Sequence, residues 1–415
     1  MNRRQPIFLM FGFGVLLIMT LCLIPYWLVR KSDARQTISA SLSTQSEAEA
    51  RKRQSEPSFD VAEWYAARGE EPETHGALIE TLSGDRLLAS HNADVTFNPA
   101  SLVKLATSLV ALKKLGADYR FQTRVYADGR IDSSGTLQGR LIVIGSDPTF
   151  GDIGAAMIAK ELRARGIQNV KGNLGVSQDF CFNFSDSPEE SAARLSKALK
   201  LNEAKTEIVN APAVATLFTF NSYPLKDLLL YMNAHSSNFV SERIGALIGG
   251  AQGVEQFLTT ELKLPASEVA IARVSGREHN RLTPRGLLTV IRALLEEAAR
   301  QSLQPEDIMP VASDDAGTLR RRLAGTGLEG AVVGKTGTLT AEVDGGMASL
   351  AGMVYTKDAG PVVFVILDQG NRIWENRQLE DQLLADVVNT LAAPRAVASP
   401  TPRRLLPPDS LKISD

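Results

Sequence analysis

The chain has 415 residues, of which 44% are hydrophobic, and a formal net charge of −2. A chain of this length and hydrophobic content can bury a sizeable core and is typical of two or three domains, while the near-neutral charge argues against a nucleic-acid partner. Its two cysteines, Cys22 and Cys181, argue against a disulfide framework.

The beginning of the chain contains a long uncharged stretch. Residues 7 to 29 carry no Asp, Glu, Lys or Arg, and as one helix they extend about 34 Å, enough to cross a bilayer. The nearest small-residue cleavage site, Ile38-Ser39-Ala40, lies far downstream for a signal peptide. We therefore predict a cytoplasmic end and an uncleaved transmembrane anchor at residues 1–31, followed by a solvated linker at residues 32–58.

Short apolar runs separated by turn residues follow the linker. Residues 77–82 and 86–91 flank Ser83-Gly84-Asp85, which indicates a β-hairpin. Strand-like segments at residues 123–132 and 140–145 and a helical segment near residues 153–165 come next. We interpret residues 118–205 as an inserted domain with a small core of its own.

Between the hairpin and this insertion, residues 98–116 predict one helix. Asn98 is the expected N-cap, Pro99 the first helical residue and Gly116 the residue just past the end. The apolar residues of this segment leave no continuous polar face, which is typical of a helix buried in a larger core.

Ser101 and Lys104 lie in the first turn of the predicted helix. At a separation of three residues their side chains project from the same side, with Cβ atoms about 5–6 Å apart. Burying a lysine is costly, and a neutral amine beside a serine can take the hydroxyl proton as the oxygen attacks a carbonyl. The Ser101 N–H can serve half of an oxyanion hole only if the Asn98 side chain caps Ala100 instead.

The second half of the chain predicts several helices and then strands. Residues 224–250 indicate a helix, a break at Ser236-Ser237-Asn238 and a second helix, and helices are also expected at residues 284–300 and around 317–323. Strands are expected at residues 331–340, 347–355 and 361–368, a closing helix at 375–391, and a disordered Pro-rich tail at 393–415. The predicted sheet takes its first two strands from the hairpin at residues 77–91 and its last three from these strands near the end of the chain.

The strand at residues 331–340 contains Lys335-Thr336-Gly337. The preceding residues nearly form a phosphate-binding loop, but the two glycines are one residue too close and no helix can follow, so we reject a nucleotide site. On a strand, Lys335 and Gly337 face one side, while Thr336 and Thr338 face the other.

Three short motifs are arranged in a diagnostic order. Ser101-Leu102-Val103-Lys104, Ser236-Ser237-Asn238 and Lys335-Thr336-Gly337 follow the order of the S-x-x-K, S-D-N and K-T-G set. Together with GRLIVIGSDPTF, PLKDLLLYMNAHSSN, SGREHNRLTP and AGTLRRRLAGTGLEGAVVGKTGTLT, they make residues 60–392 resemble the class C low-molecular-mass penicillin-binding proteins, which are serine-type D-alanyl-D-alanine carboxypeptidases and endopeptidases.

The resemblance implies an α/β (α+β) fold of the penicillin-binding and β-lactamase type, with an antiparallel sheet flanked by helices. The peptidase domain would comprise residues 59–117 and 206–392, interrupted by the inserted domain. The segment between Ser101 and Ser236 is short for the family's usual two inserted domains. Ser237 stands where Asp is commoner, and Arg273-Val274 precede Ser275-Gly276 where the family tends to have Asp-Gly, a difference that bears on substrate preference.

The resemblance also implies a role for each motif residue. Ser101 would attack the carbonyl between two D-alanines and form an acyl-enzyme, and Lys104, made neutral by burial and by Lys335, would accept the proton. Ser236 would relay a proton to the leaving amine and Asn238 would bind the peptide amide. Lys335, Thr336, Gly337 and Thr338 would bind the substrate carboxylate, with the N–H groups of Ser101 and Thr338 as the oxyanion hole.

No metal or cofactor is expected for this chemistry, and the four histidines lack metalloprotease spacing. The expected partners are peptidoglycan stem peptides, β-lactam antibiotics and, through the single anchor, the cytoplasmic membrane, with the catalytic domain on its periplasmic or extracytoplasmic side. Two alternatives remain open: a non-catalytic cell-wall binding protein on the same scaffold, and a serine β-lactamase.

Overall fold

The computed structural model describes residues 59–201, 204–357, 359–390, 393–397 and 405–415, all of which belong to one compact unit, Pro57–Asp415. The predicted anchor at residues 1–31 and the predicted linker at residues 32–58 lie outside the described residues. None of the helices in the described ranges combines the length and the apolar composition that a membrane crossing needs.

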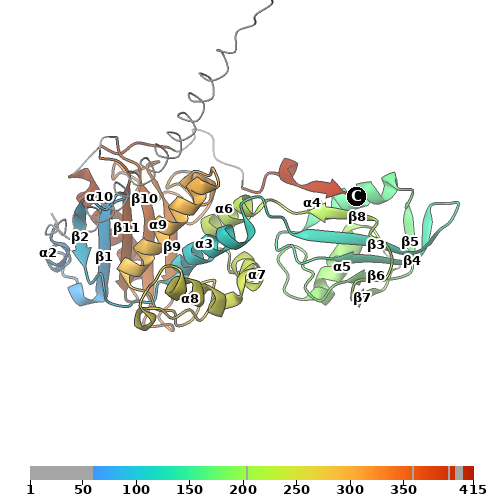
Figure 1. The fold of residues 1–415 in the computed structure, drawn as a ribbon, viewed down its shortest axis with the longest axis horizontal. Coiled ribbons are helices and arrows are strands. Elements are labelled where there is room, and N and C mark those ends of the chain that lie inside the picture. The colour runs from blue at the N-terminus through green and yellow to red at the C-terminus, as the bar shows by residue number, and fades with distance from the viewer. Residues whose placement is uncertain (1–58, 202–203, 358, 391–392, 398–404) are drawn as a thin grey trace, which may run out of the picture. The chain divides into compact units, whose positions relative to one another are not determined.

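One part of the fold is built around a five-stranded antiparallel sheet (Figure 1). Its strand order is β2 (Leu87–His91), β1 (His75–Thr81), β11 (Val362–Gln369), β10 (Met347–Val354) and β9 (Val332–Leu339). This arrangement confirms the expected sheet, in which the hairpin near the start pairs with strands from the end. Because β9 is an edge strand, one side of its backbone is left open for other groups.

Hydrophobic side chains cover both faces of this sheet, since neighbouring residues of a strand point to opposite faces. Along β11, Val363, Val365 and Leu367 belong to one core, whereas Phe364 and Ile366 belong to the other. Helices α9 (Pro284–Arg300) and α3 (Val103–Leu115) contribute to the first core, and α2 (Val61–Ala66) and α10 (Ile373–Asn389) to the second.

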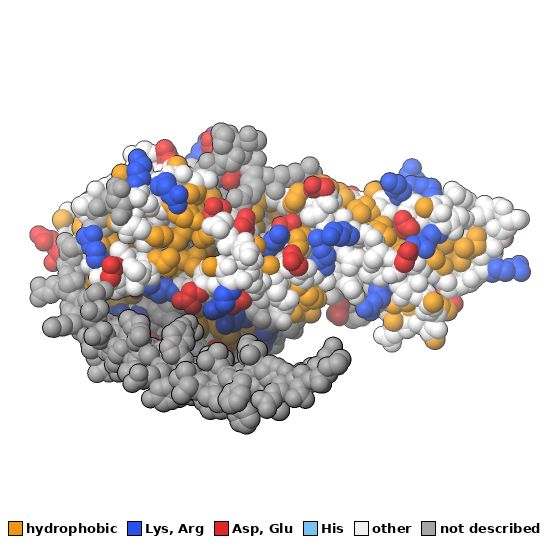
Figure 2. Space-filling model, turned by 45° about the horizontal axis from the view of Figure 1, so that its top comes forward, with side chains coloured by type: hydrophobic (Ala, Val, Ile, Leu, Met, Phe, Trp, Pro, Cys, Tyr) orange, Lys and Arg blue, Asp and Glu red, His pale blue; other side chains and the backbone are white. Residues whose placement is uncertain are grey.

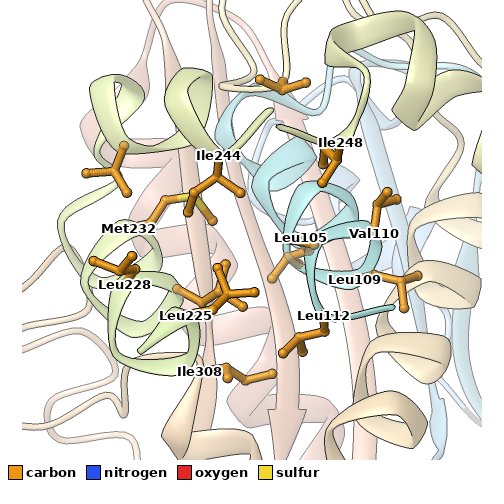
Figure 3. Packing of buried hydrophobic residues seen from close by; sticks show 14 of the residues in the cluster. Leu105, Leu109, Val110, Leu112, Leu225, Leu228, Met232, Ile244, Ile248 and Ile308 are labelled. Carbon is orange, nitrogen blue, oxygen red and sulfur yellow. The ribbon is translucent and has the colours of Figure 1, made fainter. Parts of the chain in front are cut away.

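Helix α3 is buried on all sides, as its apolar sequence predicts. It packs against α6 (Leu225–His235), α7 (Asn238–Ile248), α8 (Gly250–Thr260) and α9. Figure 3 shows buried hydrophobic side chains of this core, among them Leu105, Leu109, Val110 and Leu112 of α3, Leu225, Leu228 and Met232 of α6, and Ile244 and Ile248 of α7. This packing fixes the helix that begins just after Ser101.

A second, mixed sheet forms the inserted domain. Its order is β12 (Lys412–Ser414), β8 (Phe218–Asn221), β3 (Gln122–Ile131), β4 (Thr136–Ile144), β6 (Leu174–Val176) and β7 (Thr206–Ile208), with β5 (Asn169–Lys171) also paired to β4. Helices α4 (Asp152–Ala164) and α5 (Pro188–Ala198) belong to the same insertion. The predicted boundary at residue 205 is too early, because β7 and β8 lie in this sheet.

Two other predictions are wrong. Residues 405–415 are not a disordered tail, because β12 pairs with β8. Residues 317–323 form turns instead of a helix, since Gly317, Arg321 and Leu323 have φ angles of 142°, 60° and 63°, outside the right-handed helical region. The short 3-10 helices are η1 (Pro72–Thr74), η2 (Ala100–Leu102), η3 (Ala266–Glu268), η4 (Pro305–Asp307) and η5 (Pro408–Ser410).

The charged side chains on the face drawn in Figure 2 are of both signs and are interspersed. A nucleic-acid footprint would require basic side chains gathered over one continuous area. The distribution on this face therefore agrees with the near-neutral net charge of the sequence.

Candidate active site

Ser101 lies in the 3-10 helix η2, immediately before α3. The α-helix begins at Val103 and not at Pro99, so the predicted start is four residues early. As the oxyanion-hole interpretation requires, the Asn98 side chain accepts a hydrogen bond from the Ala100 N–H (3.1 Å). In the described part of the chain, the Ser101 N–H donates to no protein acceptor.

The Asn98 side chain is itself held in place. Its Nδ2 donates to a carboxylate oxygen of Asp344 (2.6 Å) and to the backbone oxygen of Glu278 (2.8 Å). Ala100 has a φ of 52°, in the left-handed region that non-glycine residues seldom occupy. The loop before Ser101 is thus fixed in a strained conformation of the kind found at functional sites.

Lys104 is buried and lies beside the serine. Its Nζ donates to Ser101 Oγ (3.0 Å), to Asn238 Oδ1 (2.8 Å) and to the backbone oxygen of Ser275. The expected proximity of the hydroxyl and the amine is present. The amine is also linked to the S-x-N motif, which the sequence places 134 residues further along.

Burial lowers the pKa of Lys104 to about 7. The carboxylate of Glu242 opposes this shift, and the guanidinium of Arg277 adds to it. Lys335, the cation expected to act on Lys104, is coupled to it as well, since the charge of Lys104 lowers the pKa of Lys335. Near neutral pH a substantial fraction of Lys104 is therefore uncharged and able to accept a proton.

The Ser236-Ser237-Asn238 corner joins α6 to α7. Ser236 ends α6 with a φ of 52°, a left-handed conformation that turns the chain. Ser237 is the N-cap of α7 and accepts a hydrogen bond from the Val240 N–H (3.3 Å), so its side chain serves the helix. Asn238 begins α7 and faces Lys104.

Lys335 is fully buried on β9, although an isolated edge strand suggests a solvated side chain. Its Nζ donates to Ser236 Oγ (3.0 Å) and to the backbone oxygen of Thr336 (2.5 Å). Burial holds the pKa of Lys335 well below its ordinary value, and Lys104 lowers it further. The third motif therefore meets the second through a direct hydrogen bond.

The open edge of β9 presents backbone groups of every second residue. The Gly334 N–H donates to Pro310 O, and Val332 O accepts from the Ala312 N–H. The backbone N–H and C=O groups of the even-numbered residues therefore point away from β10. Thr338 has the same orientation, and its N–H lies on this open edge. The side chains of Thr336 and Thr338 do not point towards Lys335 but bond to Thr318 and Arg377, as strand alternation predicts.

Gly337 allows η2 to pack directly on β9. A Cβ atom at this position would lie 2.2 Å from Ser349 Oγ, 2.9 Å from Ala100 Cβ and 3.0 Å from Pro99 O. The absence of a side chain therefore sets the spacing between the strand and the residue before Ser101.

We expect Gly337→Ala to reduce the rate of acylation by a β-lactam by about 10- to 100-fold, because a shift of about 1 Å at a reacting group has an effect of this size. Stopped-flow acylation kinetics measure it. Gly360→Ala is the control, because Gly360 has a φ of 72° and no atom near its added Cβ; it should lower the melting temperature without slowing acylation. Equal rates for Gly337→Ala and the wild type would contradict the packing role.

A sequence model of the D-Ala-D-Ala carboxypeptidase 3 (S13) family matches residues 60–183 and 178–388. The chain belongs to this family of serine-type D-Ala-D-Ala peptidases. It is 27% identical over 361 residues to carboxypeptidase Rv3627c of Mycobacterium tuberculosis, covering 70% of this chain and 75% of that protein. It is 33% identical over 110 residues to a D-alanyl-D-alanine carboxypeptidase of an Actinomadura species, covering 25% of this chain and 20% of that one.

The fold is shared with other peptidases of this kind. The peptidoglycan endopeptidase Bd3459 of Bdellovibrio bacteriovorus superposes with a TM-score of 0.67 at 19% identity, over 82% of this chain and 98% of that one. That protein has also been solved acylated by penicillin G and in complex with an immunity protein.

Four residues of the site were not assigned from the sequence. They are Ser275, whose backbone oxygen accepts from Lys104, Glu242 and Arg277, which act on its pKa, and Arg377, which bonds Thr338. Glu242 lies one helical turn after Asn238, a spacing that places both on the same helix face. The other three are brought in from loops and helices whose partners no local pattern indicates.

Proposed function

We propose that the protein is a serine D,D-peptidase that cleaves the D-Ala-D-Ala or D-Ala-meso-diaminopimelate bond of peptidoglycan stem peptides through an acyl-enzyme on Ser101, and that β-lactams acylate the same serine. The observation that carries this proposal is the 3.0 Å contact between Lys104 Nζ and Ser101 Oγ, with the pKa of Lys104 lowered to about 7. A hydroxyl beside a neutral amine is the activated nucleophile that acyl transfer requires.

In the acylation step, Ser101 Oγ attacks the carbonyl carbon of the penultimate D-alanine while its proton passes to Lys104. The carbonyl oxygen becomes negatively charged and is stabilised by the Ser101 and Thr338 N–H groups, which have no other role in the described fold. Collapse of the tetrahedral intermediate leaves an ester on Ser101 and breaks the C–N bond. Water then hydrolyses the ester and restores the hydroxyl.

The leaving amine must gain a proton as the C–N bond breaks. Ser236 Oγ accepts from Lys335 Nζ, and its own proton is free to pass to the amine, after which Lys335 or Lys104 can resupply it. Asn238 would bind the substrate amide, while Lys335, Thr336 and Thr338 would attract the carboxylate of the leaving group. Because side chains alternate along β9, Lys335 lies on one face of the strand and the two threonines on the other, so only some of these side chains would contact the carboxylate directly.

The proposed substrate class also implies where the peptidase domain acts. Peptidoglycan lies outside the cytoplasmic membrane, so the peptidase domain would act on the periplasmic or extracytoplasmic side. The single-pass anchor at residues 1–31 remains a prediction from the sequence.

The proposal is tested by incubating the full-length chain with fluorescent penicillin and, separately, with a diacyl-D-Ala-D-Ala peptide. We expect a persistent covalent label, located on Ser101 by mass spectrometry of tryptic peptides, together with release of D-Ala. Rapid turnover of the drug without D-Ala release would identify a β-lactamase instead. The absence of both label and D-Ala release would identify a binding protein.

The pH dependence of acylation should follow the ionisation of Lys104. Only the neutral amine accepts a proton, so the rate should rise with pH through about 7. The Glu242 carboxylate raises the pKa of Lys104, so Glu242→Gln should move the acidic limb of the rate profile to lower pH and increase the rate at pH 6 by about threefold. Initial acylation rates between pH 5 and 9 measure the shift.

Glutamine preserves the hydrogen bond that Glu242 Oε1 accepts from the Ser275 N–H (3.2 Å), so only the charge is removed. Glu255→Gln is the matched control, because Glu255 likewise accepts a backbone N–H, that of Ile271, at 2.9 Å. Its rate profile should coincide with that of the wild type. A Glu242→Gln profile shifted to higher pH would contradict Lys104 as the proton acceptor.

A further inference from the structure

The turn between β9 and β10 carries a carboxylate that contacts two other segments of the chain. Asp344 lies in this turn with a φ of 54°. Its carboxylate accepts hydrogen bonds from Asn98 Nδ2 (2.6 Å) and Arg281 Nη1 (2.7 Å), and His279 Nδ1 lies 2.9 Å from it. Three segments that are far apart in the sequence therefore meet at one half-buried carboxylate.

Asn98 links this carboxylate to the nucleophile. The Asn98 residue is buried, and its Nδ2 donates to Asp344 while its Oδ1 accepts the Ala100 N–H (3.1 Å). The amide group satisfies both contacts in one orientation only, because its oxygen accepts and its NH₂ group donates. The Asn98 oxygen thus occupies the Ala100 N–H and leaves the Ser101 N–H open to a substrate oxygen.

The same turn follows the strand that supplies the other proposed oxyanion donor, the Thr338 N–H. The turn is held at both ends: the Val343 N–H donates to Thr340 O (3.0 Å), and Gln369 Nε2 of β11 donates to Asp344 O (3.2 Å). The Asp344 side chain therefore connects the end of β9 to the loop that precedes the serine.

The third segment packs against the backbone of the serine. A Cβ atom on Gly276 would lie 2.8 Å from Ser101 Cα, and Arg281 in the same loop holds the Asp344 carboxylate through Nη1 and Nη2 (2.7 and 3.2 Å). The hydrogen bond from Arg281 is the main cause that keeps the pKa of Asp344 well below its usual range. The carboxylate is therefore ionised at neutral pH and can accept from all of its donors.

We propose that Asp344 is a positioning residue for acyl transfer, which sets the spacing between the Ser101 and Thr338 N–H groups by joining the turn after β9 to Asn98. This inference rests on the proposed function, which makes these two N–H groups the oxyanion hole. Asp344 does not touch the substrate in this role but acts through Asn98. Both donors must lie within about 3 Å of the oxygen that becomes charged, so a change in their separation weakens at least one of the two bonds.

The test is Asp344→Asn in the full-length chain. Asparagine has one acceptor oxygen instead of two and turns an NH₂ group towards the donors, so the hydrogen bond from Asn98 should be lost. We expect the rate constant of acylation by penicillin to fall by about 10- to 100-fold. The affinity of the complex that precedes acylation should stay within about twofold of the wild type, because the oxyanion forms only after attack.

Two further measurements report on the oxyanion hole itself. A phenylboronic acid forms a tetrahedral adduct on Ser101 that resembles the transition state, so its affinity for Asp344→Asn should fall by the same factor as the acylation rate. The infrared C=O stretch of the penicilloyl ester should move to higher wavenumber, because hydrogen bonds from the two N–H groups polarise this carbonyl.

Glu80→Gln is the matched control. The Glu80 side chain is 20% exposed, against 15% for Asp344, and pairs with Arg292 at 2.7 Å. This variant should leave the acylation rate, the boronate affinity and the carbonyl stretch unchanged. Asn98→Ala should slow acylation as much as Asp344→Asn, and the double variant should be no slower than either within about twofold, since Asp344 acts through Asn98.

A boronate affinity and a carbonyl stretch equal to those of the wild type in Asp344→Asn would overturn the positioning role, even if the melting temperature fell. Additive slowing in the double variant would overturn it as well. Should Asp344→Asn fail to fold, an unchanged carbonyl stretch in Asn98→Ala would have the same meaning. A wild-type chain that forms no penicilloyl ester would instead overturn the proposed function.

Discussion

Ser101→Ala should abolish covalent labelling by penicillin and slow D-Ala release by on the order of 10⁵-fold, because the acyl-enzyme cannot form without the hydroxyl. Ser101 Oγ is the atom to which Lys104 Nζ donates, at 3.0 Å. The alanine variant retains the remaining polar groups of the site, so it should still bind the drug reversibly. Fluorescence of the labelled band and mass spectrometry of the intact chain measure the loss.

Ser237→Ala is the matched control for this variant. It removes a hydroxyl from the same site, but one that caps α7 through the Val240 N–H, so we expect a loss of stability of about 1 kcal/mol and normal labelling. A covalent label that persists in Ser101→Ala would show that the nucleophile lies elsewhere.

The elements that sequence patterns predicted well are those with local signals. Pro284 at the first position of α9 and the apolar period that follows define that helix, and Ser83-Gly84-Asp85 defines the first hairpin. The three-residue spacing of Ser101 and Lys104 likewise determines which side chains meet. Such features depend on residues within one or two turns of each other.

The features that were missed depend on distant partners. β8 and β12 are four and three residues long, too short for a period, and they become strands only by pairing with each other and with β3. The tail at 405–415 therefore resembled a disordered segment by composition alone. Gly317 interrupts the expected helix for a similar reason, because it lies against the backbone of Ala234.

The site shows the same division between local and distant information. The motif residues were assigned from their order, but Ser275 O, which accepts a hydrogen bond from Lys104, was not. It belongs to a loop whose Ser275 N–H donates to the Glu242 carboxylate. The contact of Arg377 with Thr338 was not foreseen either, because α10 and β9 come from separate segments of the chain. The residue types of the motifs indicate which reaction is possible, whereas the tertiary fold determines which other residues hydrogen-bond to them and shift their pKa values.

Lys104→Met should reduce the rate of acylation by about 10³-fold, because methionine is close to lysine in length but cannot accept a proton. Lys104→Arg should be equally slow. Arginine keeps a positive charge near the serine but is not deprotonated in proteins. The two variants together therefore distinguish proton acceptance by Lys104 from electrostatic attraction by its charge. The acylation rates of the variants and the wild type are compared by stopped flow at pH 8. This pH is above the pKa of about 7 for Lys104, so the Lys104 amine of the wild type is mostly uncharged.

Folding must be checked separately, because Lys104→Met leaves Asn238 Oδ1 without its donor and leaves Ser275 O with only the 3.5 Å contact from Ser101 Oγ, and a buried acceptor without a donor costs about 1–3 kcal/mol. Lys114→Met is the matched control: it lies on the same helix, and its Nζ donates to Ile248 O (2.8 Å). It should lose less stability, because Lys114 is exposed, and should acylate normally. If Lys104→Arg acylated at the wild-type rate, a cation would be sufficient, and Ser101 would have to lose its proton to another group.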